Sequence, residues 1–290
     1  MRILVAGATG FIGSNLVPAL DEAGHDVRAL ARHEYEGPAE AYRGDLTDYD
    51  SFADALEGMD AAYYLVHSMS EPGDFSELEE TCAEHFVRAC NEHGVDRIVY
   101  LGGIVHHDAA SKHLVSRTTV GDILREAEAD VTELRAAMVL GWQSSSFQIM
   151  YQLVSRLPVM LGPRWLDSRS QPIHIDDAVA YLCEVLDHEA TRDAIYEIGG
   201  DSVHTYRELL TILAEKLGRQ VHIVTVPFLT PFLSSLWVEL VADQPRSLVR
   251  ALIESLRADM VVQNGIDDVI DRDCLTYREA LDRVLAERDD

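Results

Sequence analysis

Lysine is nearly absent from this chain. Of its 24 basic residues only Lys112 and Lys216 are lysines, and 50 acidic residues bring the formal net charge to −26. Nucleic acids and anionic membrane surfaces bind clustered basic side chains, so the charge balance argues against either as the main partner. Carboxylates keep a surface hydrated when molar salt shortens the screening length to about 3 Å. The composition therefore favours a halophilic protein; the alternative is an ordinary acidic protein from a GC-rich genome.

The chain also lacks a cysteine framework and long apolar runs. Its four cysteines, Cys82, Cys90, Cys183 and Cys274, form no CxxC pair and no metal spacing. No apolar run reaches the roughly 18 residues of a membrane-spanning helix, because two prolines and a glutamate interrupt the longest one, 226–242. The N-terminus shows no signal peptide. We therefore expect a cytoplasmic protein without a transmembrane segment. The apolar stretch 227–238 is interpreted as core packing, the floor of a lipophilic pocket, or a subunit or membrane contact.

Short apolar strands alternate with helices through most of the chain. The pattern predicts strands at 3–6, 26–31, near 41, 61–66, 97–101, 131–135 and 195–198, and helices at 11–23, 49–57, 74–93, 112–127, 144–157 and 176–186. This alternation indicates an α/β fold with a doubly wound parallel sheet. We expect residues 1–142 and about 173–200 to form this domain, and about 143–172 and 201–290 a small, mainly helical one. Asp176 or Asp177 is expected to cap the helix that follows 175.

The strongest local motif is a run of three glycines between the first strand and the first helix. Gly7 permits a tight turn, Gly10 allows the backbone to approach a diphosphate, and Gly13 allows the helix to pack closely on the strand. Free N–H groups at the start of the helix would then face an anion. The motif predicts a dinucleotide-binding turn.

Several further segments carry a resemblance to a known superfamily. They are the GATGFIG run at 7–13, GDL at 44–46, YLVHSM at 64–69, YLGG at 100–103, TELR at 132–135, PIHIDDA at 172–178 and YEIGG at 196–200. With these the chain resembles the extended and atypical short-chain dehydrogenase/reductase superfamily, on its NmrA-like and epimerase-like side. The accessory Rossmann subunit of respiratory complex I is a more distant relative. The resemblance implies a Rossmann fold and NAD(P) binding.

The end of the second strand bears on which nucleotide is bound. NAD-preferring enzymes usually place an acid there for the ribose 2′-hydroxyl, whereas this chain has Arg32, which suits a 2′-phosphate. We therefore favour NADP(H) over NAD(H). The motif and the resemblance together imply a set of cofactor-binding residues: Gly7, Ala8, Thr9, Gly10, Phe11 and Ile12 at the turn, Arg32, Asp45 and Leu46 near the adenosine, and Val66, His67, Ser68, Gly102 and Arg117 toward the nicotinamide.

The superfamily's catalytic signature, Tyr-x-x-x-Lys, is missing. The corresponding helix positions hold His113 and Arg117, and Gly102 and Gly103 stand near the usual serine. In one interpretation Arg117 grips the ribose and His113 donates a proton, in a reductase of a small apolar acceptor such as a quinone or enone. In the other, the chain is a non-catalytic nucleotide-binding sensor or assembly protein. The sequence also allows a homo-oligomer.

Several histidines near the fifth strand suggest a metal at first sight. His106, His107, Asp108 and His113 include adjacent histidines whose side chains diverge, and no second carboxylate–histidine pair lies nearby. We therefore predict no metal site, and place these residues at the mouth of a polar cleft. For His174 the resemblance implies a structural role.

Overall fold

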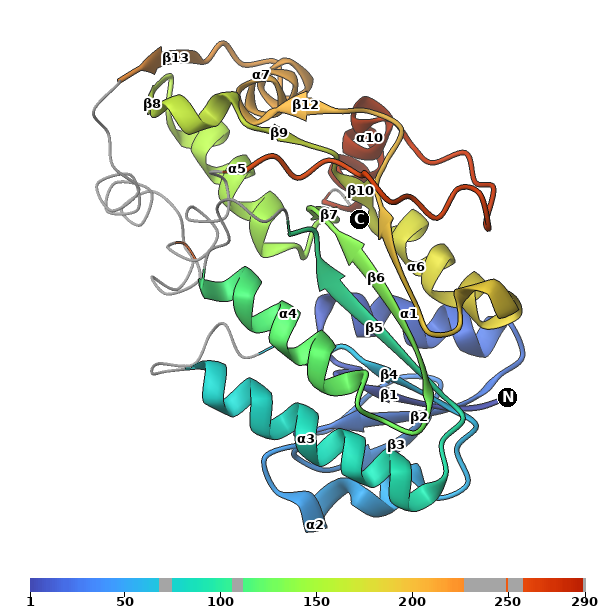
Figure 1. Cartoon of the computed structure of the whole chain (residues 1–290). Helices are drawn as coiled ribbons and strands as arrows, with labels where there is room; N and C mark the ends of the chain where they lie inside the picture. Colours follow the sequence, from blue (N-terminus) through green and yellow to red (C-terminus); the bar gives the residue numbers. More distant parts are fainter. Residues whose placement is uncertain (68–74, 106–111, 227–248, 250–257, 289–290) are drawn as a thin grey trace.

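The computed structural model describes residues 1–67, 75–105, 112–226, 249 and 258–288. Its centre is a parallel sheet with the strand order β11-β6-β5-β4-β1-β2-β3 (Figure 1). The strands are β1 (Arg2–Ala6), β2 (Asp26–Ala31), β3 (Glu40–Arg43), β4 (Ala61–Tyr64), β5 (Arg97–Gly103), β6 (Asp130–Ala136) and β11 (Ala194–Ile198). The chain leaves β1 toward β2 and β3 on one side and then returns to β4 on the other. The carboxyl ends of β1 and β4 therefore form the switch point at which doubly wound sheets bind ligands.

Helices cover both faces of this sheet. Alternate residues of β1 point to opposite sides, so that Ile3 and Val5 join one apolar cluster and Leu4 and Ala6 the other. The first cluster lies under α1 (Phe11–Glu22) and α6 (Ile175–Glu184), and the second under α3 (Phe75–His93) and α4 (Lys112–Leu124) (Figure 1). The predicted doubly wound fold is confirmed.

A third apolar cluster is built by the later part of the chain. It joins α5 (Ser145–Arg156), α7 (Tyr206–Lys216) and α10 (Tyr277–Glu287). Three two-stranded sheets accompany these helices: β7 (Val139–Leu140) with β10 (Ile173–His174), β9 (Arg169–Ser170) with β12 (His204–Thr205), and β8 (Val159–Gly162) with β13 (His222–Thr225). The segment predicted as core packing or a pocket floor, 227–238, lies outside the described residues. In the described part no helix is long and apolar enough to cross a membrane.

Two local predictions were wrong. The helix predicted at 49–57 is an α-helical turn, α2 (Tyr49–Phe52), followed by a 3-10 helix (Ala53–Leu56), because the backbone leaves helical geometry at the buried Phe52, where φ is −130°. The second concerns α6, which begins at Ile175, one residue earlier than predicted. His174 is therefore its N-cap and accepts a hydrogen bond from the Asp176 N–H at 3.2 Å, while Asp176 and Asp177 fall in the first turn.

Candidate nucleotide-binding site

The glycine turn after β1 is dictated by backbone contacts. Gly7 has φ +86°, and a Cβ there would stand 2.8 Å from the carbonyl oxygen of Leu65, which follows β4. A Cβ on Gly13 would stand 2.2 Å from the Gly7 carbonyl oxygen. Both positions therefore require glycine for the chain to turn sharply and for α1 to lie against the end of β1. The roles predicted for these two glycines match the geometry.

The start of α1 is left without a cap of its own. Gly10 is the N-cap, so no side chain accepts from the first N–H groups, and the first turn contains no acidic residue. The nearby polar side chains of Ser14 and Asn15 bond instead to the Phe11 carbonyl oxygen, at 3.3 and 2.7 Å. The N–H groups of residues 11–13 and the positive end of the helix dipole thus fit an anion such as a diphosphate.

The side chains of the turn serve packing more than binding. Ala8 is fully buried, and Phe11 and Ile12 pack against the apolar cluster beneath α1 and α6. A Cβ on Gly141, at the start of the segment leading to α5, would stand 2.6 Å from the Phe11 ring. These predicted cofactor residues therefore offer a ligand mainly their backbone, whereas Thr9 and Gly10 are exposed.

Arg32 and Asp45 lie at the carboxyl ends of β2 and β3, beside α3. The pKa of the Cys82 thiol on α3 is raised to about 11, chiefly by burial; the Asp45 carboxylate contributes to the rise and the Arg32 guanidinium opposes it. Both charges are therefore within electrostatic range of one thiol. Asp45 Oδ1 accepts from the Thr47 N–H at 2.9 Å and from its hydroxyl at 2.8 Å, and Leu46 is buried. The structure thus brings the predicted adenosine-side residues to one edge of the sheet.

Arg117 forms the other corner of the site, at the ends of β4 and β5. Its Nη2 donates to His67 Nε2 at 2.6 Å and to the Leu101 carbonyl oxygen at 2.9 Å. Its own carbonyl oxygen accepts from the buried Tyr100 hydroxyl at 3.1 Å. A Cβ on Gly103 would stand 3.1 Å from a methyl carbon of Leu114 and 3.7 Å from Cδ of Arg117. The glycine at the end of β5 therefore allows α4 to lie close to the strand.

Sequence reasoning missed the buried charges that support this corner. The side chain of Glu133 on β6 is only 2% exposed, and it accepts from Arg135 Nε at 2.7 Å and from the Arg125 guanidinium. A Cβ on Gly102 or Gly121 would stand 3.0 or 2.8 Å from its carboxylate, so glycine leaves room for it. The signal was present as two opposite charges, Glu133 and Arg135, spaced by two on one strand, which places both on one face.

Some predicted site residues cannot be placed. Ser68, His106, His107 and Asp108 lie outside the described residues, and so does the side chain of His113, although its backbone belongs to α4. The predicted cofactor-binding residue Val66 lies two residues after β4 and is partly buried against the apolar cluster under α3 and α4. The proton donor suggested by the sequence therefore stays a prediction.

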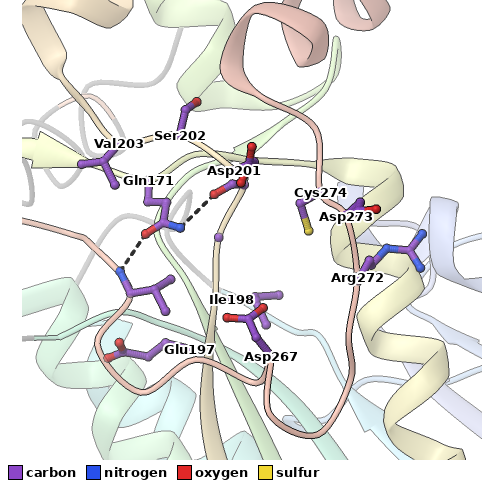
Figure 2. A pocket seen from close by; sticks show the side chains of 13 residues that line it. Gln171, Glu197, Ile198, Asp201, Ser202, Val203, Asp267, Arg272, Asp273 and Cys274 are labelled. Carbon is purple, nitrogen blue, oxygen red and sulfur yellow. Dashed lines mark hydrogen bonds between the residues drawn. The ribbon is translucent and has the colours of Figure 1, made fainter.

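A cavity of about 250 Å³ lies elsewhere, beside the end of β11 (Figure 2). Its polar walls are bonded within the fold: the Gln171 side chain bridges the Val262 N–H and the Gly200 carbonyl oxygen, and Arg272 Nη1 donates to Glu184 at 2.6 Å. β11 is four strands from β1, or about 19 Å at the usual spacing. The cavity is therefore separate from the glycine turn.

Comparison with known proteins agrees with this geometry. Residues 7–144 match a family model described as NAD(P)H-binding. A 3β-hydroxysteroid dehydrogenase/isomerase of Mycobacterium tuberculosis is 34% identical over 105 residues, 35% of this chain and 28% of that protein. The chain spans about a third of the length of the first curated relatives it matches.

Three longer matches cover most of the chain. The 2′-dehydrokanamycin reductase of Streptomyces kanamyceticus is 25% identical over 96% of this chain and 80% of that one. The Arabidopsis thaliana mitochondrial NADH dehydrogenase [ubiquinone] 1 alpha subcomplex subunit 9 is 25% identical over 77% of this chain and 60% of that one. The structure of a Citrobacter sp. triphenylmethane reductase complexed with NADP(H) aligns with a TM-score of 0.79 and 18% identity, covering 98% of this chain and all of that one.

Proposed function

The chain is a relative of the atypical short-chain dehydrogenase/reductase superfamily, and from that premise we propose that it binds NADP(H) and reduces a small apolar acceptor such as a quinone or enone. The observation that carries the proposal is the uncapped start of α1, reached through a turn that only glycine fits. Such a helix end stabilises a diphosphate through its N–H groups and its dipole. When bound, the dihydronicotinamide supplies a hydride.

Each end of the proposed nucleotide has a cation at the sheet edge. Arg32, at the end of β2, would meet the 2′-phosphate as a planar fork of donors, with Asp45 and Leu46 beside the adenine. Arg117 would hold the nicotinamide ribose, and its buried Nε has no hydrogen-bond partner among the described residues. A buried donor without an acceptor costs about 1–3 kcal/mol, so a ligand acceptor beside this guanidinium would remove that cost.

The choice of acceptor follows from the residues that replace tyrosine and lysine. Arginine keeps its proton at all physiological pH values, so Arg117 can bind and orient but cannot relay a proton. Hydride transfer to a quinone or an enone needs less acid assistance than carbonyl reduction, and His113 would supply that assistance. Two of the relatives that cover most of the chain are reductases by name, which supports this reaction class.

A second function is favoured by a specific similarity. The match to the complex I subunit covers 77% of this chain, and the chain lacks Tyr-x-x-x-Lys. In that role the nucleotide would be bound and retained without turnover, in a sensor or an assembly protein.

One experiment separates the two functions. The binding of NADPH and of NADH is measured by calorimetry, and NADPH absorbance is followed with panels of quinones and enones. Binding with oxidation of NADPH by at least one acceptor supports the reductase. Tight binding without oxidation by any acceptor contradicts it and supports the second role. No binding of either nucleotide contradicts both.

A further inference from the structure

We infer that His67 is a positioning residue: it fixes the guanidinium of Arg117 in the orientation needed to meet the nicotinamide ribose. The inference rests on the proposed function and adds a residue to it. The two side chains come from sites 50 residues apart in the sequence, the end of β4 and the middle of α4, and meet at 2.6 Å.

The contact uses one nitrogen of the guanidinium completely. Nη2 carries two hydrogens, and it has two acceptors, the Leu101 carbonyl oxygen at 2.9 Å and His67 Nε2. Leu101 lies in β5 directly after Tyr100, which pairs with Tyr64 of the neighbouring strand β4, and His67 follows Tyr64 by three residues. The guanidinium is therefore held at two points across the boundary between the two strands.

Two hydrogen bonds to Nη2 fix the orientation of the guanidinium plane, which a single hydrogen bond does not. A guanidinium is a rigid plane, so fixing both hydrogens of Nη2 also sets the directions of the N–H bonds on Nη1 and Nε. If Leu101 provided the only acceptor for Nη2, the plane would be less firmly held than it is with His67 as a second acceptor. Holding a binding group in one orientation before the ligand arrives improves affinity, because less motion is lost on binding.

The rest of the corner confirms that the backbone of Arg117 is already fixed without His67. The Tyr100 hydroxyl donates to the Arg117 carbonyl oxygen at 3.1 Å, and the neighbouring Ser116 hydroxyl donates to the buried Glu79 carboxylate on α3. These contacts tie α4 to β5 and α3. The contribution left to His67 is the orientation of the side chain. Because an arginine always donates, His67 must accept at Nε2 and carry its hydrogen on Nδ1.

The test compares substitutions that remove or keep the acceptor. His67→Ala removes it, and His67→Gln keeps an oxygen near the position of Nε2. The dissociation constant for NADPH is measured by calorimetry in both variants, in Arg117→Met and in the double variant His67→Ala/Arg117→Met. His222→Ala, at an exposed histidine on β13, is the matched control, and thermal unfolding verifies that each variant is folded.

We expect His67→Ala to weaken NADPH binding about tenfold, as for loss of a hydrogen bond to a charged group. His67→Gln should restore most of the affinity, and the double variant should bind no more weakly than Arg117→Met alone. Equal losses in the Ala and Gln variants, an unchanged affinity in the Ala variant, or a further loss in the double variant would each overturn the inference. Failure of the wild-type protein to bind NADPH would instead overturn the proposed function.

Discussion

Two helices lie side by side on one face of the sheet, and their first turns are built in opposite ways. α6 begins at a histidine whose ring caps it, with Asp176 and Asp177 in the first turn. α1 begins at Gly10, with no side-chain cap and no acid. Carboxylates stabilise a helix start because they compensate its dipole. The N-terminus of α6 is thus capped by side chains of the protein itself, whereas the N-terminus of α1 is open to an external anion.

Gly13→Ala should have the largest effect on the nucleotide-binding start of α1. The new Cβ would meet the Gly7 carbonyl oxygen, so the turn must move; we expect loss of NADPH binding and a stability lower by about 1–3 kcal/mol. Urea unfolding and calorimetry measure the two effects. Gly24→Ala is the control: it costs stability because Gly24 has a φ of +84°, but the added Cβ would meet no atom within 4 Å. NADPH binding should survive there, and an equal loss of NADPH binding in both variants would contradict the account.

Gly10→Asp tests the comparison directly, by giving α1 the kind of cap that α6 has. Gly10 has φ −75°, which any residue adopts, and a Cβ there would stand 3.3 Å from the Gly7 carbonyl oxygen, a contact that a small shift relieves, so the stability should change by no more than about 1 kcal/mol. The carboxylate would occupy and repel the diphosphate position, and NADPH affinity should fall at least about 100-fold. Gly10→Asn, a neutral cap of the same shape, should lose less affinity than Gly10→Asp. If the aspartate variant binds NADPH as tightly as the wild type, the start of α1 is not the anion-binding site.

Arg32→Ala tests whether the adenosine end of the site distinguishes NADPH from NADH. A lost charge-assisted bond to a 2′-phosphate should weaken NADPH binding about tenfold while leaving NADH binding unchanged. Both dissociation constants are measured by calorimetry, with Arg43→Ala, at an exposed arginine at the end of β3, as the control. Equal losses for the two nucleotides would show that Arg32 does not read the phosphate.

The smallest effect concerns the cap of α6. Burial lowers the pKa of His174 below its ordinary 6.5, although the nearby carboxylates act to raise it. The unfolded chain therefore binds a proton more readily, so stability should fall as the pH drops below about 6.5, by at most about 1.4 kcal/mol per pH unit.

His174→Asn keeps a capping side chain but removes the titration, so urea unfolding between neutral and mildly acidic pH should show a shallower loss than in the wild type. The control is His222→Asn, at an exposed position on β13. Its free energy of unfolding should fall with pH as steeply as that of the wild type. Identical slopes for His174→Asn and wild type would assign the acid sensitivity to other groups.

The sequence was informative wherever backbone geometry alone decides the structure. Gly7 and Gly13 could be assigned their roles from spacing, since no other residue fits those contacts. The predicted N-cap of α6 was wrong, because the helix begins one residue earlier than predicted. That shift makes His174 the N-cap in place of Asp176 or Asp177. The contact between His67 and Arg117 could not be predicted, because it depends on how α4 lies across two strands rather than on any local pattern.

Calorimetric titration of the wild-type protein with NADPH and NADH tests the central claim most directly. Because the acidic composition predicts a protein that is stable at high salt, the titration should be run in both dilute and molar KCl. We predict saturable binding of one nucleotide per chain, tighter for NADPH, in the salt condition where the protein is folded. A folded protein that takes up neither nucleotide in either condition would contradict the claim that the start of α1 is built for a dinucleotide.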